Sequence, residues 1–286
     1  MSFRIAVIPV AGLGTRFLPV TKAVAKELIP LVDRPLIQYA VEEAVAAGAE
    51  RIVLVSSPAK AGILELFAAD AQLEAMLERR GEDELLAAIR RLSSLAKVEA
   101  VLQEQPLGVG HAILQARHAV GDEDFAVLFP DDFIRAAVPV LEQLRRVHAA
   151  RGGIVVAVER VPVERVHRYG VIRGERVADR IYRVDGLVEK PSPQEAPSDL
   201  AIVGRYVLPG EIFPILERTG AGAGGEIQIT DAMQAALGAY PCHAVRFEGR
   251  RFDCGSRVGY LEATLAVAAD DPELRPVLER FRAGHD

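Results

Sequence analysis

The chain has 286 residues, half of them hydrophobic and about a quarter charged, with a formal net charge of −6. This length and apolar content are enough to bury a large core in one α/β domain or two small ones. The acidic balance argues against broad binding to nucleic acid, which needs a basic surface. The two cysteines, Cys242 and Cys254, are too few for a disulfide framework, and we expect buried or incidental thiols.

No targeting or membrane segment is predicted. The N-terminus runs straight into an apolar strand without a cleavage-site pattern, and no apolar run approaches the ~18 residues of a membrane span. We therefore expect a cytoplasmic protein that does not associate with membranes.

Strand-like and helix-like segments alternate through the first 160 residues. Continuously apolar runs such as Val53–Val55 and Val127–Phe129 are typical of strands buried on both faces. The alternation predicts an α/β fold with a mostly parallel central sheet and helices on both faces. Predicted strands are 5–10, 51–57, 98–103, 125–129 and 154–159, and predicted helices are 35–47, 69–92 with a break at Gly81, 110–119 and 138–150.

After about residue 160 short strand-like pieces are interrupted by Gly and Pro. This texture predicts a small antiparallel extension of the same sheet, not a second domain. The predicted strands here are 169–173, 176–184 and 200–207, and the predicted helices are 228–237, 258–269 and 272–282. We therefore expect one domain over 1–286.

A glycine-containing loop follows the first strand. It reads Ala11-Gly12-Leu13-Gly14-Thr15-Arg16 and lies where ligands bind in open α/β sheets. Glycines let backbone N–H groups approach phosphate, and an arginine adds donors suited to phosphate. Phe17 stands where a dinucleotide fingerprint has its third glycine, and no P-loop lysine is present. The loop predicts phosphate binding, with an ordinary tight turn as the alternative.

Three charged residues downstream could act on that phosphate. Lys26 could neutralise a triphosphate, although a single lysine is more often a solvated surface residue. Asp131 ends an apolar strand, and Asp253 ends another strand-like run before a glycine. Paired carboxylates suit Mg²⁺, but either aspartate could instead cap a turn or helix.

Glu189 and Lys190 lie side by side before Pro191. A carboxylate can accept from sugar hydroxyls, and an ammonium can bind a phosphate. Within a strand the two side chains would face opposite sides, but the proline suggests that the strand is ending there. An exposed charge pair is the alternative.

The order of these motifs, together with several others, resembles one family. The chain resembles the bacterial UTP–glucose-1-phosphate uridylyltransferases, or UDP-glucose pyrophosphorylases, of the sugar nucleotidyltransferase group, from about residue 4 to about residue 268. The stretches at 200–206 and 225–231 are specific to that enzyme within the group. The matching segments are Ile8–Arg16, Lys26–Glu27, Pro35–Tyr39, Pro106–Ala112, Val188–Pro191, Leu200–Tyr206, Gly225–Asp231 and Asp253–Gly255.

The resemblance implies a Rossmann-like three-layer nucleotidyltransferase fold. It also implies a nucleotide-binding part at about 1–160, a sugar-phosphate-binding part at about 161–255 and C-terminal helices at about 256–286. The expected partners are UTP, glucose 1-phosphate and a second copy of the chain, as a homodimer or homotetramer.

Residue roles follow from the same resemblance. The nucleotide is expected to contact Ala11, Gly12, Gly14, Thr15, Arg16, Lys26, Gln103 and Gly108. The sugar phosphate is expected to contact Gly170, Glu189, Lys190, Gly204 and Thr230. Asp131 and Asp253 match the two Mg²⁺ carboxylates, and Arg16, Lys26 and Lys190 match the cations that act in catalysis.

The implied reaction transfers UMP from UTP to glucose 1-phosphate by direct in-line displacement. The sugar phosphate is already ionised, so catalysis needs positioning and charge neutralisation but no side-chain nucleophile. Departures from the family pattern occur at Ala25, Leu102 and Arg257. Leu102 precedes the base-reading Gln103, so Gln105 is kept as an alternative to it. Other hypotheses are an enzyme that uses dTTP or another NTP, and a non-catalytic paralogue that binds nucleotide-sugars.

Overall fold

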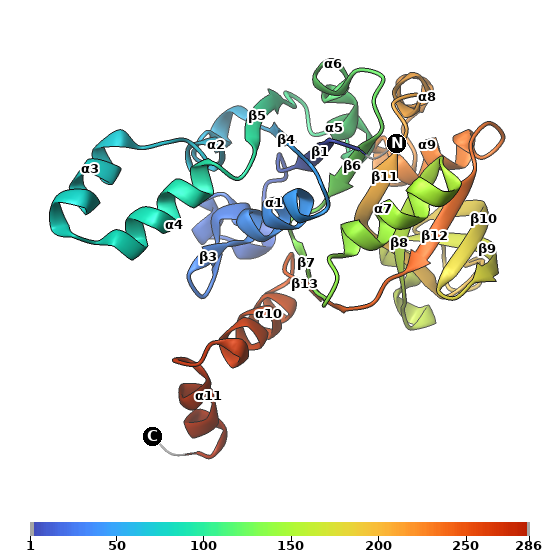
Figure 1. Cartoon of the computed structure of the whole chain (residues 1–286). Coiled ribbons are helices and arrows are strands. Elements are labelled where there is room, and N and C mark those ends of the chain that lie inside the picture. The colour runs from blue at the N-terminus through green and yellow to red at the C-terminus, as the bar shows by residue number, and fades with distance from the viewer. Residues whose placement is uncertain (1–2, 285–286) are drawn as a thin grey trace.

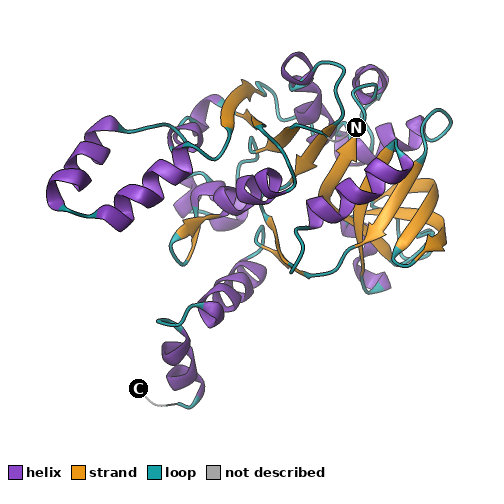
Figure 2. Cartoon of the chain, in the orientation of Figure 1, coloured by secondary structure: helices purple, strands orange, loops and turns teal. Residues whose placement is uncertain are grey.

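The computed structural model describes residues 3–284, and its centre is a nine-stranded sheet (Figures 1 and 2). From edge to edge the strand order is β5-β4-β1-β6-β11-β8-β12-β10-β9. The strands are β1 (Ile5–Pro9), β4 (Arg51–Ser56), β5 (Lys97–Leu102), β6 (Phe125–Leu128), β8 (Ile154–Arg160), β9 (Gly170–Ala178), β10 (Ile181–Glu189), β11 (Leu200–Leu208) and β12 (Cys242–Arg246).

The sheet is mixed, and β10 and β11 run against its other strands. β1 pairs in parallel with both β4 and β6, β4 with β5, and β8 with β12. β11 is antiparallel to its neighbours β6 and β8, while β10 is antiparallel to β12 and β9. The predicted mostly parallel sheet with an antiparallel extension is confirmed.

Helices cover both faces of the sheet, which makes three layers (Figure 1). Strand side chains alternate between the faces, so Ala6 and Ile8 pack on one side and Ile5 and Val7 on the other. The first face packs against α1 (Leu36–Ala46) and α7 (Val140–Arg151). The second packs against α5 (Val109–Gln115), α8 (Ile212–Arg218) and α9 (Ile229–Ala236), with the short α6 (Arg117–Val120) beside α5.

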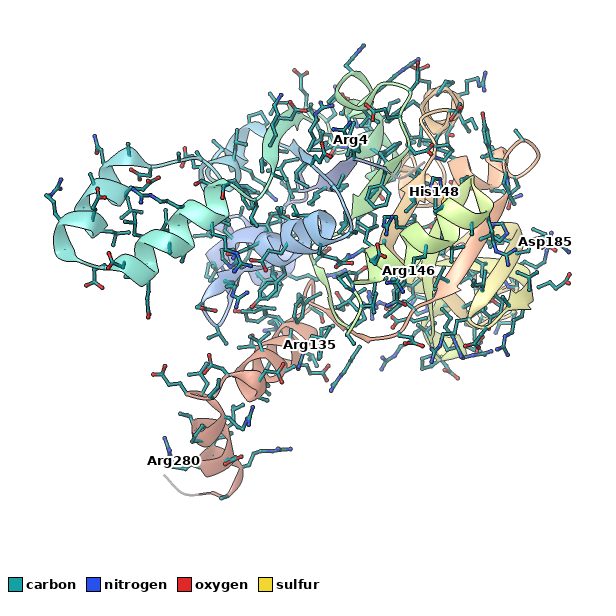
Figure 3. The ribbon with its side chains drawn as sticks, viewed as in Figure 1. Arg4, Arg135, Arg146, His148, Asp185 and Arg280 are labelled. Carbon is teal, nitrogen blue, oxygen red and sulfur yellow. The ribbon has the colours of Figure 1, made fainter. Side chains whose placement is uncertain are left out.

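Two helical pairs extend from this body (Figure 1). After the short α2 (Gly62–Glu65), α3 (Ala71–Arg80) and α4 (Asp83–Ser93) form a hairpin, and Gly81 ends α3 with a φ of 70°. The second pair is α10 (Arg257–Asp270) and α11 (Arg275–Arg282). Arg135 donates to the carbonyl of Ala266 at 2.8 Å and pairs with Asp270, which ties α10 to the body (Figure 3).

Two small sheets complete the fold. β2 (Pro30–Leu31) pairs with β3 (Arg34–Pro35), and β7 (Asp132–Arg135) pairs with β13 (Arg250–Asp253). Both cysteines are buried and free, as predicted. Within residues 3–284, no helix is both long and apolar enough to cross a membrane.

The prediction of a strand at 176–184 was wrong, because that segment contains a hairpin turn. β9 runs on to Ala178 and β10 begins at Ile181, with Arg180 at a φ of 56°. The turn residues Asp179 and Arg180 are charged and lack the glycine that usually marks such a turn. α8, β7 and β12 were not predicted, and Pro35 precedes α1 as its N-cap residue instead of starting the helix.

Candidate active site

Two adjoining cavities open at the carboxyl edge of the sheet. Because β1, β5 and β6 belong to its parallel part, the segments that follow them emerge at one edge. The first cavity, here the loop cavity, has a volume of about 280 Å³. Its lining is Pro9, Ala11, Gly12, Lys26, Glu27, Gln103, Pro106, Gly108, Val109, Ala112, Phe129, Asp131 and Glu226.

The second cavity, here the hairpin cavity, has a volume of about 410 Å³ and includes the ends of β9 and β10. It shares Val109, Phe129, Asp131 and Glu226 with the loop cavity. Ligands in the two cavities would therefore meet beside Asp131. Its lining also has Arg16, Asp132, Arg168, Tyr169, Gly170, Glu189, Lys190, Ile202, Gly204, Tyr206, Gln228, Ile229, Thr230, Arg251 and Asp253.

Lys60 binds two backbone carbonyls of the segment that carries the glycine loop. The sequence alone did not point to this residue. The Lys60 ammonium donates to the carbonyl of Val10 at 2.6 Å, to the carbonyl of Gly12, and to Glu27 at 2.8 Å. The side chains of Lys60 and Glu27 are 9% and 1% exposed. Three contacts from this one cation fix the carbonyls of Val10 and Gly12 and tie them to Glu27.

We expect Lys60→Met to weaken binding of the ligand of the loop cavity about tenfold and to destabilise the fold, because it leaves the Glu27 carboxylate buried without its closest cation. Equilibrium binding and urea unfolding would measure the two effects. The matched control is Lys97→Met at the exposed start of β5, where neither quantity should change. Unchanged ligand binding in Lys60→Met would contradict the support of the loop by Lys60.

Lys26 lies between the loop and the candidate metal carboxylates. Its ammonium is 2.6 Å from Asp131 Oδ2 and 3.9 Å from Glu27 Oε1. Burial lowers the pKa of Lys26, but the two carboxylates outweigh burial and raise it. For Asp131, burial acts to raise the pKa, but the positive charge of Lys26 outweighs burial. The pKa of Asp131 therefore lies below its usual range. Both groups are therefore charged at neutral pH, and the pair weakens only as acid protonates Asp131 or strong base deprotonates Lys26.

Asp131 and Asp253 flank one point at Gly255. A Cβ added to Gly255 would lie 3.1 Å from Asp253 Oδ1, 3.2 Å from Asp131 Oδ2 and 3.4 Å from Arg16 Nη1. Arg16 also donates to the Gly255 carbonyl at 3.2 Å, and Arg168 lies 3.1 Å from Asp253 Oδ2. Ser256, not Asp253, caps α10 by accepting from Gly259 N, and Asp131 precedes a strand, so neither aspartate caps a helix.

This donor set fits Mg²⁺. The ion usually takes one or two carboxylates and completes its shell with water and substrate phosphates. Asp131 and Asp253 supply two carboxylates around a glycine that leaves the space between them open. No group of three or more His, Cys, Asp or Glu side chains suited to a metal occurs within residues 3–284. Water or substrate phosphates would complete the shell of a metal held by these two carboxylates.

Glu189, Lys190, Gly170 and Thr230 meet in the hairpin cavity. A Cβ on Gly170 would lie 2.7 Å from Thr230 Oγ1 and 3.1 Å from Glu189 Oε2, so only glycine fits there. Lys190 has a φ of 48°, and β10 ends at the residue before it. Because the strand does not continue, Glu189 and Lys190 need not face opposite sides, and both line the same cavity. The Lys190 ammonium lies 3.5 Å from Glu189 Oε1.

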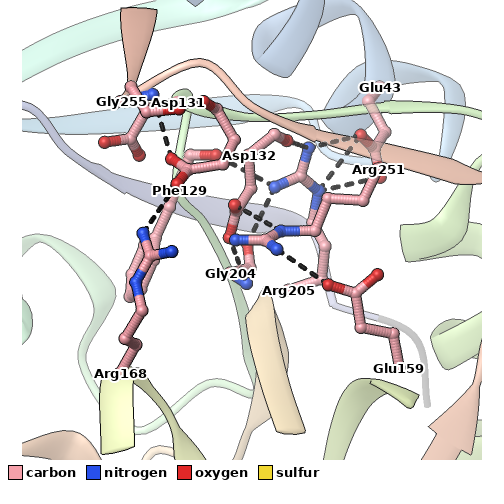
Figure 4. Close-up of polar contacts among 12 residues, drawn as sticks. Glu43, Phe129, Asp131, Asp132, Glu159, Arg168, Gly204, Arg205, Arg251 and Gly255 are labelled. Carbon is pink, nitrogen blue, oxygen red and sulfur yellow. Dashed lines mark hydrogen bonds and ion pairs between the residues drawn. The ribbon is translucent and has the colours of Figure 1, made fainter. Parts of the chain in front are cut away.

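An ionic network joins the residues around the wall that the two cavities share (Figure 4). Arg205, 2% exposed, contacts both oxygens of Glu43 and donates to the carbonyls of Phe129, Gly204 and Asp132.

Asp132 continues this network toward β11 and β13. Its carboxylate accepts from Gly204 N at 2.7 Å and from Arg251 at 2.6 Å. Arg251 in turn donates to Glu159 at 2.7 Å. The network fixes the backbone on both sides of Asp131.

Most of the predicted site residues come together in these cavities. Gly14 and Thr15 are not in either lining; Gly14 supplies a φ of 64° for the turn into the short helix Thr15–Phe17. Gln103 is 6% exposed and lines the loop cavity, whereas Gln105 is exposed and lines neither, so the geometry favours Gln103.

Lys60, Arg168 and Arg251 were not predicted as site residues, because each stands outside any local motif and only tertiary contacts bring it to the site. Glu226 was not singled out either, although it lies within the Gly225–Asp231 segment.

The chain is similar in sequence to known proteins over almost its whole length. The model of the nucleotidyl transferase family matches residues 5–270. A UTP–glucose-1-phosphate uridylyltransferase of Bacillus subtilis (strain 168) is 46% identical over 98% of this chain and 96% of its own length.

Solved structures agree as well. A UTP-bound UGPase from Acinetobacter baumannii matches with a TM-score of 0.90 and 40% identity, covering 98% of this chain and 99% of its own. A UDP-glucose pyrophosphorylase complexed with UDP-glucose matches with a TM-score of 0.87 and 39% identity, covering 94% of this chain and 100% of its own. The chain therefore belongs to the nucleotidyl transferase family, and its fold is the nucleotidyltransferase fold.

Proposed function

We propose that the chain transfers UMP from UTP to α-D-glucose 1-phosphate in a Mg²⁺-dependent reaction that gives UDP-glucose and pyrophosphate. The observation that carries the proposal is the junction of two cavities at Asp131, with Arg16 and Lys26 beside it. The names of the similar proteins, which include UTP and UDP-glucose, supply the substrates.

The loop cavity is assigned to UTP. Gln103 and Gly108 meet the base, while Ala11, Gly12 and Lys26 meet the phosphates. Arg16 lines the hairpin cavity and would reach the phosphates from the junction at Asp131. Gly14 and Thr15 line neither cavity, so their assignment to the nucleotide rests on the resemblance alone. The proposed nucleotide-binding part is about 1–160.

The hairpin cavity is assigned to the sugar phosphate. Glu189 accepts from sugar hydroxyls, Lys190 binds the phosphate, and Gly170, Gly204 and Thr230 shape the wall. These residues lie in the part at about 161–255. Asp131 and Asp253 would hold Mg²⁺, which when bound offsets negative charge on the phosphates.

The chemistry needs positioning and charge neutralisation. A phosphate oxygen of glucose 1-phosphate attacks the α-phosphorus of UTP, and the bond from that phosphorus to the oxygen bridging to the β-phosphorus breaks. Pyrophosphate leaves with the electron pair of that bond. Arg16, Lys26 and Lys190 place positive charge around the transferring and attacking phosphates, so no side-chain nucleophile is required.

We expect Lys190→Ala to raise the KM for glucose 1-phosphate about tenfold or more while the KM for UTP changes little, because the side chain lies in the hairpin cavity alone. Steady-state kinetics with each substrate varied in turn would measure this. Lys97→Ala serves as the control for loss of one positive charge far from the site. An equal rise in both KM values would count against the assignment.

The test of the whole proposal is pyrophosphate release over a grid of UTP, dTTP, CTP, ATP and GTP with several sugar 1-phosphates. UTP with glucose 1-phosphate should give the highest kcat/KM. A clear preference for dTTP would identify the related enzyme, and binding without turnover would identify a non-catalytic paralogue. The cytoplasmic location and the homodimer or homotetramer stay predictions.

A further inference from the structure

Three side chains beside the loop cavity form a hydrogen-bonded chain that the proposed reaction does not use. Gln103 follows β5 directly and is buried against α5. Its amide nitrogen donates to the Gly108 carbonyl at 3.2 Å and lies 3.0 Å from Nδ1 of His111. The other ring nitrogen of His111 lies 3.1 Å from the amide of Gln115, one turn along α5.

The acceptors around Gln103 fix the direction of its amide. A carbonyl can only accept, so the NH₂ group must face Gly108. The second hydrogen of that group faces Nδ1 of His111, which must then accept. A neutral imidazole accepts at one nitrogen only, so Nε2 carries the proton and donates to the Gln115 oxygen. This needs a half-turn of the Gln115 amide, which gives up the 3.4 Å contact from its nitrogen to the His111 carbonyl, a contact at the limit of hydrogen-bond length.

The oxygen of Gln103 is thereby left for a ligand. Both amide hydrogens are engaged, Oε1 has no hydrogen-bond partner among residues 3–284, and the side chain lines the loop cavity. Gln103 can therefore meet a base as an acceptor only. Uracil and thymine present an N3–H donor between two carbonyls, whereas cytosine presents a bare N3 acceptor at the same position. Two facing acceptors repel, which disfavours cytosine.

We propose that His111 is a positioning residue that, together with the Gly108 carbonyl, holds the Gln103 amide as an acceptor and so makes the site select bases with an N3–H group over cytosine. The identity of the ligand as a nucleotide rests on the proposed function. This role can be distinguished from simple packing. Loss of a positioning residue should change the ratio of the affinities for UTP and CTP, whereas loss of a packing residue should weaken both affinities equally.

The test compares the wild type with His111→Phe and His111→Asn. Phenylalanine keeps a planar ring but has no acceptor, while the asparagine oxygen can accept where Nδ1 does. Equilibrium binding and kcat/KM would be measured for UTP, dTTP and CTP. We expect His111→Phe to lower the preference for UTP over CTP about tenfold, with dTTP following UTP and the KM for glucose 1-phosphate unchanged. His111→Asn should retain most of the preference.

Equal weakening of UTP and CTP binding in a folded His111→Phe variant would overturn the proposal. A loss of the preference for UTP over CTP in His111→Asn as large as in His111→Phe would overturn it as well. If His111→Phe does not fold, Gln115→Leu frees the same ring and should shift the ratio in the same direction by less. An unchanged ratio in that variant also contradicts the proposal. Binding ratios need no turnover, so a wild type that binds UTP but releases no pyrophosphate would refute the proposed function and leave this test intact.

Discussion

Asp131→Asn is expected to reduce kcat roughly a hundred- to a thousandfold, the effect of losing one preorganised charge contact to a transition state. The carboxylate lines both cavities and flanks Gly255 together with Asp253. Asparagine keeps the shape of the side chain and can still accept a hydrogen bond from Lys26. Because the Lys26–Asp131 pair is partly exposed, the free energy of unfolding should fall by no more than about 1 kcal/mol. Pyrophosphate release at saturating substrates, with Mg²⁺ varied, would measure the loss.

The matched control is Asp185→Asn. Asp185 is an exposed aspartate on β10 that pairs with Arg173 at 2.7 Å and lines neither cavity. Figure 3 shows it at the outer side of the sheet. Its removal should leave kcat unchanged. Near-normal Mg²⁺-dependent turnover in both Asp131→Asn and Asp253→Asn would refute the metal assignment.

Arg205→Met is expected to lower the free energy of unfolding by about 3–5 kcal/mol, the range for breaking one side of a buried ion pair. The guanidinium is 2% exposed and the Glu43 side chain 12%. Methionine fills much of the volume but leaves the Glu43 carboxylate without its cation and removes one hydrogen bond from each of the carbonyls of Phe129, Gly204 and Asp132. Urea unfolding followed by circular dichroism would give the difference.

Arg160→Met is the control, since Arg160 pairs with Asp199 at the surface and its side chain is 55% exposed. It should cost less than about 1 kcal/mol. The double variant Glu43→Gln with Arg205→Met should be less destabilised than the two single losses added together, because it leaves no buried unpaired charge. A loss for Arg205→Met as small as that for Arg160→Met would show that the network contributes little.

The nucleotide side of the site could be predicted because its residues follow strands. Gly12 and Asp131 each come soon after an apolar strand in the parallel part of the sheet, and such segments gather at one edge. Strand recognition therefore sufficed to bring these two together, whereas Gln103, which follows the half-exposed strand β5, came from the resemblance. Glu189 and Lys190 could be put forward from their chemistry, but Gly170 came from the resemblance, because it meets Glu189 only through the register of the β9–β10 hairpin.

The supporting residues could not be predicted, because their partners lie far away in the sequence. Arg205 stands inside the apolar run of β11, and Glu43, its partner, is 162 residues away. Nothing near either residue indicates the pair. Lys60 follows β4 as an isolated lysine and gains its role only when the fold places it under Val10 and Gly12. Local patterns predict elements and their edges, but they do not predict which buried charges pair across the core.

The most direct measurement of the central proposal is the fate of label from UTP carrying ³²P at the α-phosphorus, incubated with glucose 1-phosphate and Mg²⁺. A single in-line displacement predicts that the label appears in UDP-glucose, that unlabelled pyrophosphate forms in equal amount, and that no labelled enzyme accumulates. Label retained on the protein would contradict direct transfer, and an absence of labelled UDP-glucose would contradict the proposed reaction itself.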